Sequence, residues 1–171
     1  FNGLYGRDRL SVHTPAGQLL EHLFGYDTCG RMGSVGSGTH SATYAYTPSS
    51  DLLATTTFKR NGAHVMTTTR SWEYGVRLGA IVNQVANANL SSHSYLYDQV
   101  NRRTQAVMED GSMWKYEYNS RDELISGKHF WPDWAPFAGQ QFGYAYDNIG
   151  NCRAAWSGGD SNGSNLRQTG Y

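Results

Sequence analysis

One short unit recurs along this chain and constrains its fold more than any other feature. It consists of two aromatic residues separated by one position, followed by a turn sequence, and its clearest copy has Tyr144, Tyr146, Asp147 and Gly150. Alternate residues of a β-strand share one face, so the two tyrosines are expected on one side of a strand. Asp initiates a type I turn, and Gly accepts the positive φ that often follows it. The unit therefore predicts a strand, a tight turn and a returning strand.

Six copies of the unit follow one another in the sequence. Their second aromatic residues are spaced 20 to 28 positions apart, at Tyr26, Tyr46, Tyr74, Tyr97, Tyr118 and Tyr146. The copies with Asp27 and Gly30, and with Asp98 and Asn101, keep the turn chemistry, whereas the copy at Tyr74 is shortened. A period of this length indicates an array of small units rather than one globular core.

The segments between the copies also favour β-structure. Asn61-Gly62 is a strong signal for a two-residue hairpin turn, and Asp110-Gly111 predicts a second one. Residues 81–90 (IVNQVANANL) fit either a short helix or a strand, while residues 130–139 (FWPDWAPFAG) predict an aromatic loop. The alternation of turn signals predicts an all-β chain of antiparallel hairpins.

Charge and motif content point away from several functions. Fourteen basic and fourteen acidic residues give a net charge of zero, and a nucleic-acid partner normally requires a basic excess. The six histidines lack a metal-ligand spacing and the sequence has no CxxC pair, so we expect no metal, no cofactor and no catalytic site. No run of 18 apolar residues predicts a membrane span. Cys29 and Cys152 are expected as free thiols, although spacing alone leaves a disulfide open.

The pattern Tyr-x-Tyr-Asp-x-x-Gly-Arg/Asn resembles the YD repeat of the Rhs family. That family includes bacterial Rhs polymorphic toxins, the BC component of insecticidal Tc toxins and the teneurins. The best matches are residues 24–32, 95–103 and 143–153, and the repeat-defining residues are Tyr26, Asp27, Gly30, Tyr97, Asp98, Tyr144, Tyr146, Asp147 and Gly150. The resemblance implies hairpins wound as a spiral sheet into part of a hollow shell. The family's self-cleavage motif contains Asp-Pro, which does not occur here, so that activity is not carried over.

The resemblance suggests a division of the chain and two functions. We expect a degenerate leading repeat or connector at 1–22, the repeat array at 23–157 and a polar loop entering a further strand at 158–171, all within a longer protein. The first function is a structural shell segment that encloses or displays a toxin or other polypeptide, secreted or at a bacterial cell surface. The alternative is an adhesin or binding module for glycans or proteins.

Two sets of aromatic residues bear on the choice between these functions. Stacked tyrosines of neighbouring repeats are expected to pack against one another, although exposed aromatics could also stack on sugar rings. Trp131 and Trp134 are the stronger ligand candidates, since they lie in the aromatic loop outside the repeat positions. Anchoring of that loop is the competing role for both.

Overall fold

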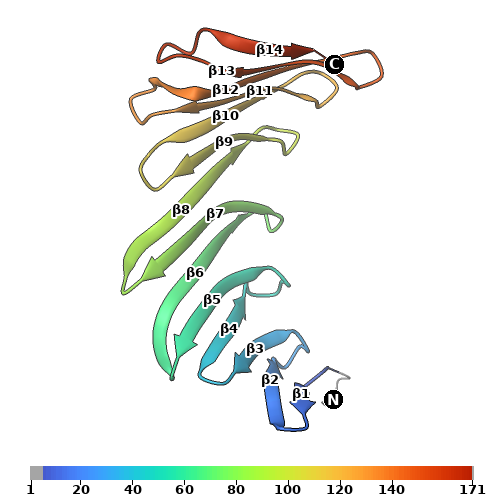
Figure 1. Cartoon of the computed structure of the whole chain (residues 1–171), viewed down its shortest axis with the longest axis vertical. Coiled ribbons are helices and arrows are strands. Elements are labelled where there is room, and N and C mark those ends of the chain that lie inside the picture. The colour runs from blue at the N-terminus through green and yellow to red at the C-terminus, as the bar shows by residue number, and fades with distance from the viewer. Residues whose placement is uncertain (1–5, 171) are drawn as a thin grey trace. The chain divides into compact units, whose positions relative to one another are not determined.

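The computed structural model describes residues 6–170, and these residues form strands and turns without any helix (Figure 1). Residues 1–5 of the predicted leading segment and Tyr171 lie outside the described residues. Hydrogen bonds join the strands in chain order in one antiparallel sheet. The predicted all-β fold of consecutive antiparallel hairpins is confirmed. The strands are β1 (Arg9–Thr14), β2 (Gly17–Tyr26), β3 (Met32–Ser37), β4 (His40–Tyr46), β5 (Leu53–Arg60), β6 (Ala63–Glu73), β7 (Arg77–Val85), β8 (Ala88–Tyr97), β9 (Arg103–Met108), β10 (Met113–Tyr118), β11 (Leu124–Phe130), β12 (Pro136–Tyr146), β13 (Cys152–Gly158) and β14 (Leu166–Gly170).

The chain divides into two units, Phe1–Ser91 and Ser92–Tyr171, and the division falls within β8. In each unit a strand folds back on the one before it through a short turn (Figure 1). Every described strand belongs to this one sheet. An apolar side chain is therefore covered only by neighbouring side chains on its own face of the sheet. The buried apolar side chains are accordingly small or slender: Ala42, Ala106, Met113 and Ala154.

The commonest turn has five residues and the same hydrogen bonds wherever it occurs. At 147–151 the Asp147 N–H donates to the Asn151 carbonyl (2.9 Å), and the Gly150 N–H donates to the Asp147 carbonyl (3.3 Å). Gly150 has a φ of 93°. This is a type I turn followed by a left-handed residue, which twists in the same sense as the strands it joins. The same bonds close the turns at 27–31, 98–102, 108–112, 119–123, 131–135 and 160–164.

The predicted two-residue turn at Asp110-Gly111 is wrong, whereas the one at Asn61-Gly62 is correct. Both Asn61 and Gly62 have positive φ (51° and 78°), as a type I′ turn requires. In the Met108–Ser112 turn Gly111 has a positive φ (80°) and Asp110 does not. The Asp110 side chain instead accepts the Ser112 N–H at 2.8 Å, which stabilises the longer five-residue turn.

Each second aromatic position is marked by an irregularity in strand pairing. The register shifts immediately before Tyr26, Tyr46, Tyr97, Tyr118 and Tyr146, and also before Trp72. A bulge of this kind adds local twist and redirects the side chain that follows it. Trp72, and not Tyr74, therefore holds the repeat position in the third copy.

The shortened copy ends in a different turn from the others. Residues 74–76 join β6 to β7. Tyr74 (φ 50°) and Gly75 (φ 67°) are the central residues of a turn closed by the Val76 N–H on the Glu73 carbonyl at 3.1 Å. Tyr74 therefore lies in the turn and not on the strand. The Tyr74 side chain is consequently 87% exposed at the tip of the turn.

The helix alternative for residues 81–90 is also wrong. β7 continues to Val85, Ala86 and Asn87 form a turn with φ of 47° and 66°, and β8 begins at Ala88. Ile81 and Val82 are β-branched and pair with Arg70 and Thr69 across the sheet. Asn tolerates the left-handed conformation, so this stretch forms a hairpin instead of a helix.

Candidate functional site

The carboxylates of the repeat turns hold those turns closed. Asp147 Oδ1 accepts the N–H groups of Ile149 and Asn151 (both 2.9 Å), and Oδ2 accepts Asn151 Nδ2 (3.0 Å). The Asn151 N–H is the main reason that the pKa of Asp147 lies below its usual value, because it stabilises the charged form against the opposing effect of burial. Deprotonated Asp147 is thus part of the folded turn.

An arginine takes the place of Asn151 in the copies at Asp27 and Asp98. Asp27 Oδ2 accepts Arg31 Nε at 2.8 Å, and Asp98 Oδ2 accepts Arg102 Nε at 2.6 Å. The Arg31 N–H is the largest cause of the lowered pKa of Asp27. At Asp98 burial is the largest influence and raises the pKa, but the hydrogen bonds from Arg102 and Val100 together outweigh it and lower the pKa.

These arginines also link each turn to the next turn on the same edge of the sheet. Arg31 Nη1 donates to the Ser50 carbonyl, and its guanidinium lies 4.2 Å from the centre of the Tyr46 ring. Arg102 Nη1 donates to the Asn119 carbonyl (3.2 Å) and to Asp122 Oδ1 (2.7 Å). The planar guanidinium can serve several acceptors and an aromatic face at once, so one side chain joins two repeats.

A third arginine makes the same link from a different turn position. Arg121 donates from Nη1 to the Asn148 carbonyl (2.7 Å) and from Nη2 to the Asp147 carbonyl (2.6 Å). The Asn119 turn that contains Arg121 is thereby tied to the Asp147 turn. Neither the acceptors nor the direction of these contacts is visible in the sequence, because they join residues 26 and 27 positions apart.

In five repeats the aromatic that follows the bulge is hydrogen-bonded through its polar atom. Tyr46 Oη donates to the Met32 carbonyl (2.8 Å), Tyr118 Oη to Arg103 (2.8 Å), and Tyr146 Oη to Leu124 (2.9 Å). Tyr26 Oη donates to the Arg7 carbonyl (2.9 Å), and Trp72 uses Nε1 to reach the Leu53 carbonyl (3.0 Å). The acceptor precedes or begins the strand paired with the one that carries the aromatic. These aromatics therefore fasten the start of one hairpin to its end.

One turn with the repeat chemistry lies inside the predicted polar loop. Asp160 Oδ1 accepts the N–H groups of Asn162 and Ser164 (both 2.9 Å), and Oδ2 accepts Asn165 Nδ2 (2.7 Å). Its sequence signal is Asp-x-x-Gly at 160–163, without the preceding aromatic pair. Residues 159–163 also spell GxSxG, but a hydrolase nucleophile elbow needs a strand leading into a helix. Here the segment joins β13 to β14.

The two candidate ligand-binding tryptophans lie in one turn but contact different groups. The Trp131 ring stacks on Phe137 at 4.2 Å, and Phe137 stacks on His129 at 4.7 Å. Trp134 lies against Phe130 at 6.2 Å and under the Lys115 ammonium at 4.1 Å. His129 and Phe130 are consecutive in β11, so their side chains point to opposite faces. The structure thus separates Trp131 and Trp134, which are 43% and 53% exposed, instead of forming one platform.

The Trp131 side of the sheet is an aromatic cluster with a buried polar centre. His129 is 6% exposed and lies between Phe137 and Trp114, whose ring is 4.9 Å away and nearly parallel. Its Nδ1 lies 2.9 Å from Gln140 Oε1. Gln141 is 1% exposed and donates from Nε2 to the carbonyls of His129 (2.7 Å) and Phe137 (3.1 Å). These contacts pack the turn at 131–135 against β11 and β12.

Chemistry-bearing groups do not converge in the part of the chain that the structure describes. No set of three His, Cys, Asp or Glu side chains there could hold a metal ion. Cys29 and Cys152 are free thiols. Among residues 6–170 there is no helix of the length and apolarity that a bilayer crossing requires.

The fold and its repeated contacts define a class: a protein built from antiparallel hairpins, in which each hairpin is bonded chiefly to its neighbours. Solved structures with the same fold include TcdB2–TccC3–TEV (TM-score 0.56, 11% identity) and TcdB2–TccC3–Cdc42 (TM-score 0.51, 14% identity). The matches cover 94% and 95% of this chain but only 12% and 11% of those chains. This chain therefore spans about a tenth of the length of the structures it matches. No protein-family model matches the sequence, and no curated protein does either.

Proposed function

We propose that this chain is a wall segment of an Rhs-type shell, which encloses or displays another polypeptide in a secreted or cell-surface protein. The observation that carries the proposal is the repeated link between consecutive turns through Arg31, Arg102 and Arg121. A wall must be extended by adding like units, and contacts limited to adjacent repeats allow this. The proposal assigns no catalytic step, cofactor or nucleic-acid partner to these residues.

Three further features support a wall. The second aromatics and the turn carboxylates use local hydrogen bonds, so each hairpin is held in shape without a large core. The fold is similar to that of the Tc toxin proteins TcdB2–TccC3, whose chains are many times longer than this one. The YD repeat pattern of the sequence agrees with the same family. A stiff sheet of this kind would isolate its contents mechanically.

The test is the size and shape of the native protein that contains this sequence. We expect denaturing mass analysis to give a chain many times larger than 19.0 kDa. Electron microscopy of the purified particle should then show a closed, hollow shell. A native product of about this mass would overturn the proposal, since the 14 strands formed by residues 6–170 cannot enclose a polypeptide. Specific binding on a glycan array by such a short product would favour the adhesin alternative.

A further inference from the structure

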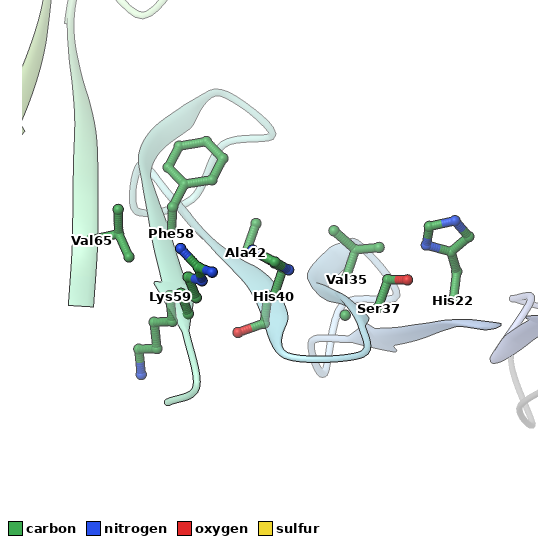
Figure 2. A pocket seen from close by; sticks show the side chains of 11 residues that line it. His22, Val35, Ser37, His40, Ala42, Phe58, Lys59 and Val65 are labelled. Carbon is green, nitrogen blue, oxygen red and sulfur yellow. The ribbon is translucent and has the colours of Figure 1, made fainter. Parts of the chain in front are cut away.

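A shallow apolar groove of about 510 Å³ crosses β2 to β6 in the first unit (Figure 2). Val35 pairs with Ala42, and Ala42 pairs with Phe58, so their side chains form one row across three strands. Figure 2 shows these side chains on the same side of the ribbon, with Val65 beside Phe58. Val65 is 44% exposed. Val35 and Phe58 are half-buried and Ala42 is 6% exposed at the floor of the groove, so another molecule could contact Val35, Phe58 and Val65.

The groove has a basic border. The side chains of His22, His40 and Arg60 line it, and no acidic residue does; Lys59 lines it only through its backbone, because its side chain alternates to the opposite face. Arg60 lies two positions after Phe58 in the same strand, which places both side chains on one face. Arg60 makes no ion pair within residues 6–170. Glu21 precedes His22 and so belongs to the opposite face, where it contacts Arg9 at 3.4 Å. A ligand in the groove would meet positive charge that the chain does not neutralise.

We propose that the groove binds an extended apolar polypeptide segment flanked by acidic side chains. Five neighbouring strands span about 19 Å, which is the length of about six extended residues. Alternate apolar side chains of such a segment would contact Val35 and Phe58 above Ala42. Carboxylates at its two ends would lie beside His22 on β2 and Arg60 on β5. The unpaired Arg60 guanidinium beside an apolar surface selects for a partner that carries negative charge.

This inference deepens the proposed function, because a wall that encloses a polypeptide must contact it somewhere. The groove can nevertheless be tested with the chain as it stands. The probe is a fluorescein-labelled eight-residue peptide with glutamate at both ends and valine and leucine alternating with threonine between them. The matched control peptide carries lysine in place of the glutamates. Fluorescence anisotropy is measured during titration with the 171-residue protein.

We expect saturable binding of the glutamate peptide and binding of the lysine peptide that is weaker by about tenfold or more. Raising the salt concentration from about 0.05 M to 0.5 M should reduce the difference, because salt screens exposed charges. Equal affinities for the two peptides would overturn the proposal.

A matched pair of variants locates the binding. Val65→Glu introduces a negative charge beside Phe58 at an exposed position, so the strand should still fold. Leu23→Glu changes a residue of similar exposure (46%) on the opposite face of β2. We expect Val65→Glu to weaken binding of the glutamate peptide by about tenfold and Leu23→Glu to leave it unchanged. Equal effects of the two variants would contradict the groove as the site.

A second copy of this chain in the groove, and a failure of the wall function, would each give a different experimental result. Sedimentation that shows a dimer abolished by Val65→Glu, without peptide binding, would assign the groove to a second copy and overturn the proposal. A hollow native particle whose groove fails these tests would leave the wall function standing and remove only the groove assignment. Peptide binding by a native product of about 19.0 kDa would support the groove as a binding site and overturn the wall function.

Discussion

The hydroxyl of Tyr146 provides the sharpest test of how the repeats are held together. Tyr146→Phe removes a single hydrogen bond, from Oη to the Leu124 carbonyl at 2.9 Å, and keeps the ring. A bond of this kind contributes a net 0.5–1.5 kcal/mol, so we expect unfolding to become easier by about 1 kcal/mol. That is about a fivefold change in the equilibrium between folded and unfolded forms.

Tyr144→Phe is the matched control for this variant. Tyr144 lies two positions earlier in β12, and its hydroxyl has no hydrogen bond within the described residues. Its removal should change the free energy of unfolding by less than about 0.5 kcal/mol. Urea denaturation measures both values. Hydrogen exchange should show the loss of protection from Tyr146→Phe mainly at β11, β12 and β13, since repeats contact their neighbours.

Alkaline pH offers a second readout of the same side chain. Burial, the largest cause, raises the pKa of Tyr146 above its ordinary value of 10.0. A raised pKa contributes stability that is fully present below pH 10 and is lost as the pH rises through the folded-state pKa. Tyr146→Phe should therefore lose less stability between pH 9 and 11 than the parent protein loses. Equal destabilisation by Tyr146→Phe and Tyr144→Phe, with identical alkaline profiles, would refute the hydroxyl contact.

Three other substitutions test separate contacts. Asp98→Asn should reduce the loss of stability in acid. The lowered pKa of Asp98 contributes stability that is present above the ordinary pKa of 3.8 and is lost as the pH falls through the folded-state pKa. Urea denaturation at about pH 2.5 and 6 measures this, and an equal loss of stability in the variant and the parent would contradict it. Gly150→Ala should cost about 1–2 kcal/mol, because Gly150 has a φ of 93°, whereas Gly36→Ala, without a positive φ, should cost less. Gln141→Leu should cost about 2–4 kcal/mol, because it leaves two carbonyls without their donor, and thermal unfolding that matches the parent would contradict this.

The hairpin architecture was predictable because its causes are local. The Asp147 turn and the Asn61-Gly62 turn depend on residues within five positions, and the preference of those residues for turns is a property of their own backbones. The error at Asp110 has the same origin. Asp-Gly is compatible with both a two-residue and a five-residue turn, and the choice depends on how the flanking strands pair.

The third repeat shows where local pattern stops being sufficient. Trp72 and Tyr74 both satisfy an aromatic-x-aromatic pattern, so the sequence assigns the second aromatic to Tyr74 by analogy with the other copies. The bulge before Trp72 depends on its pairing with β7, and the Nε1 contact with Leu53 depends on β5. Contacts with β5 and β7 thus place Trp72 at the repeat position, two residues before the Tyr74 that the sequence pattern predicts.

The sequence by itself determined the all-β fold, the repeat and the carboxylate-capped turns, since each follows from residues close together in the chain. Only the tertiary structure decided that Trp131 and Trp134 lie on different faces, that arginines join successive turns, and that Val35, Ala42 and Phe58 form one apolar row. These arrangements join strands through register, and a shift of one residue would reverse every side chain. Register is set by pairing between strands, and for that reason it is invisible in any single stretch of the sequence.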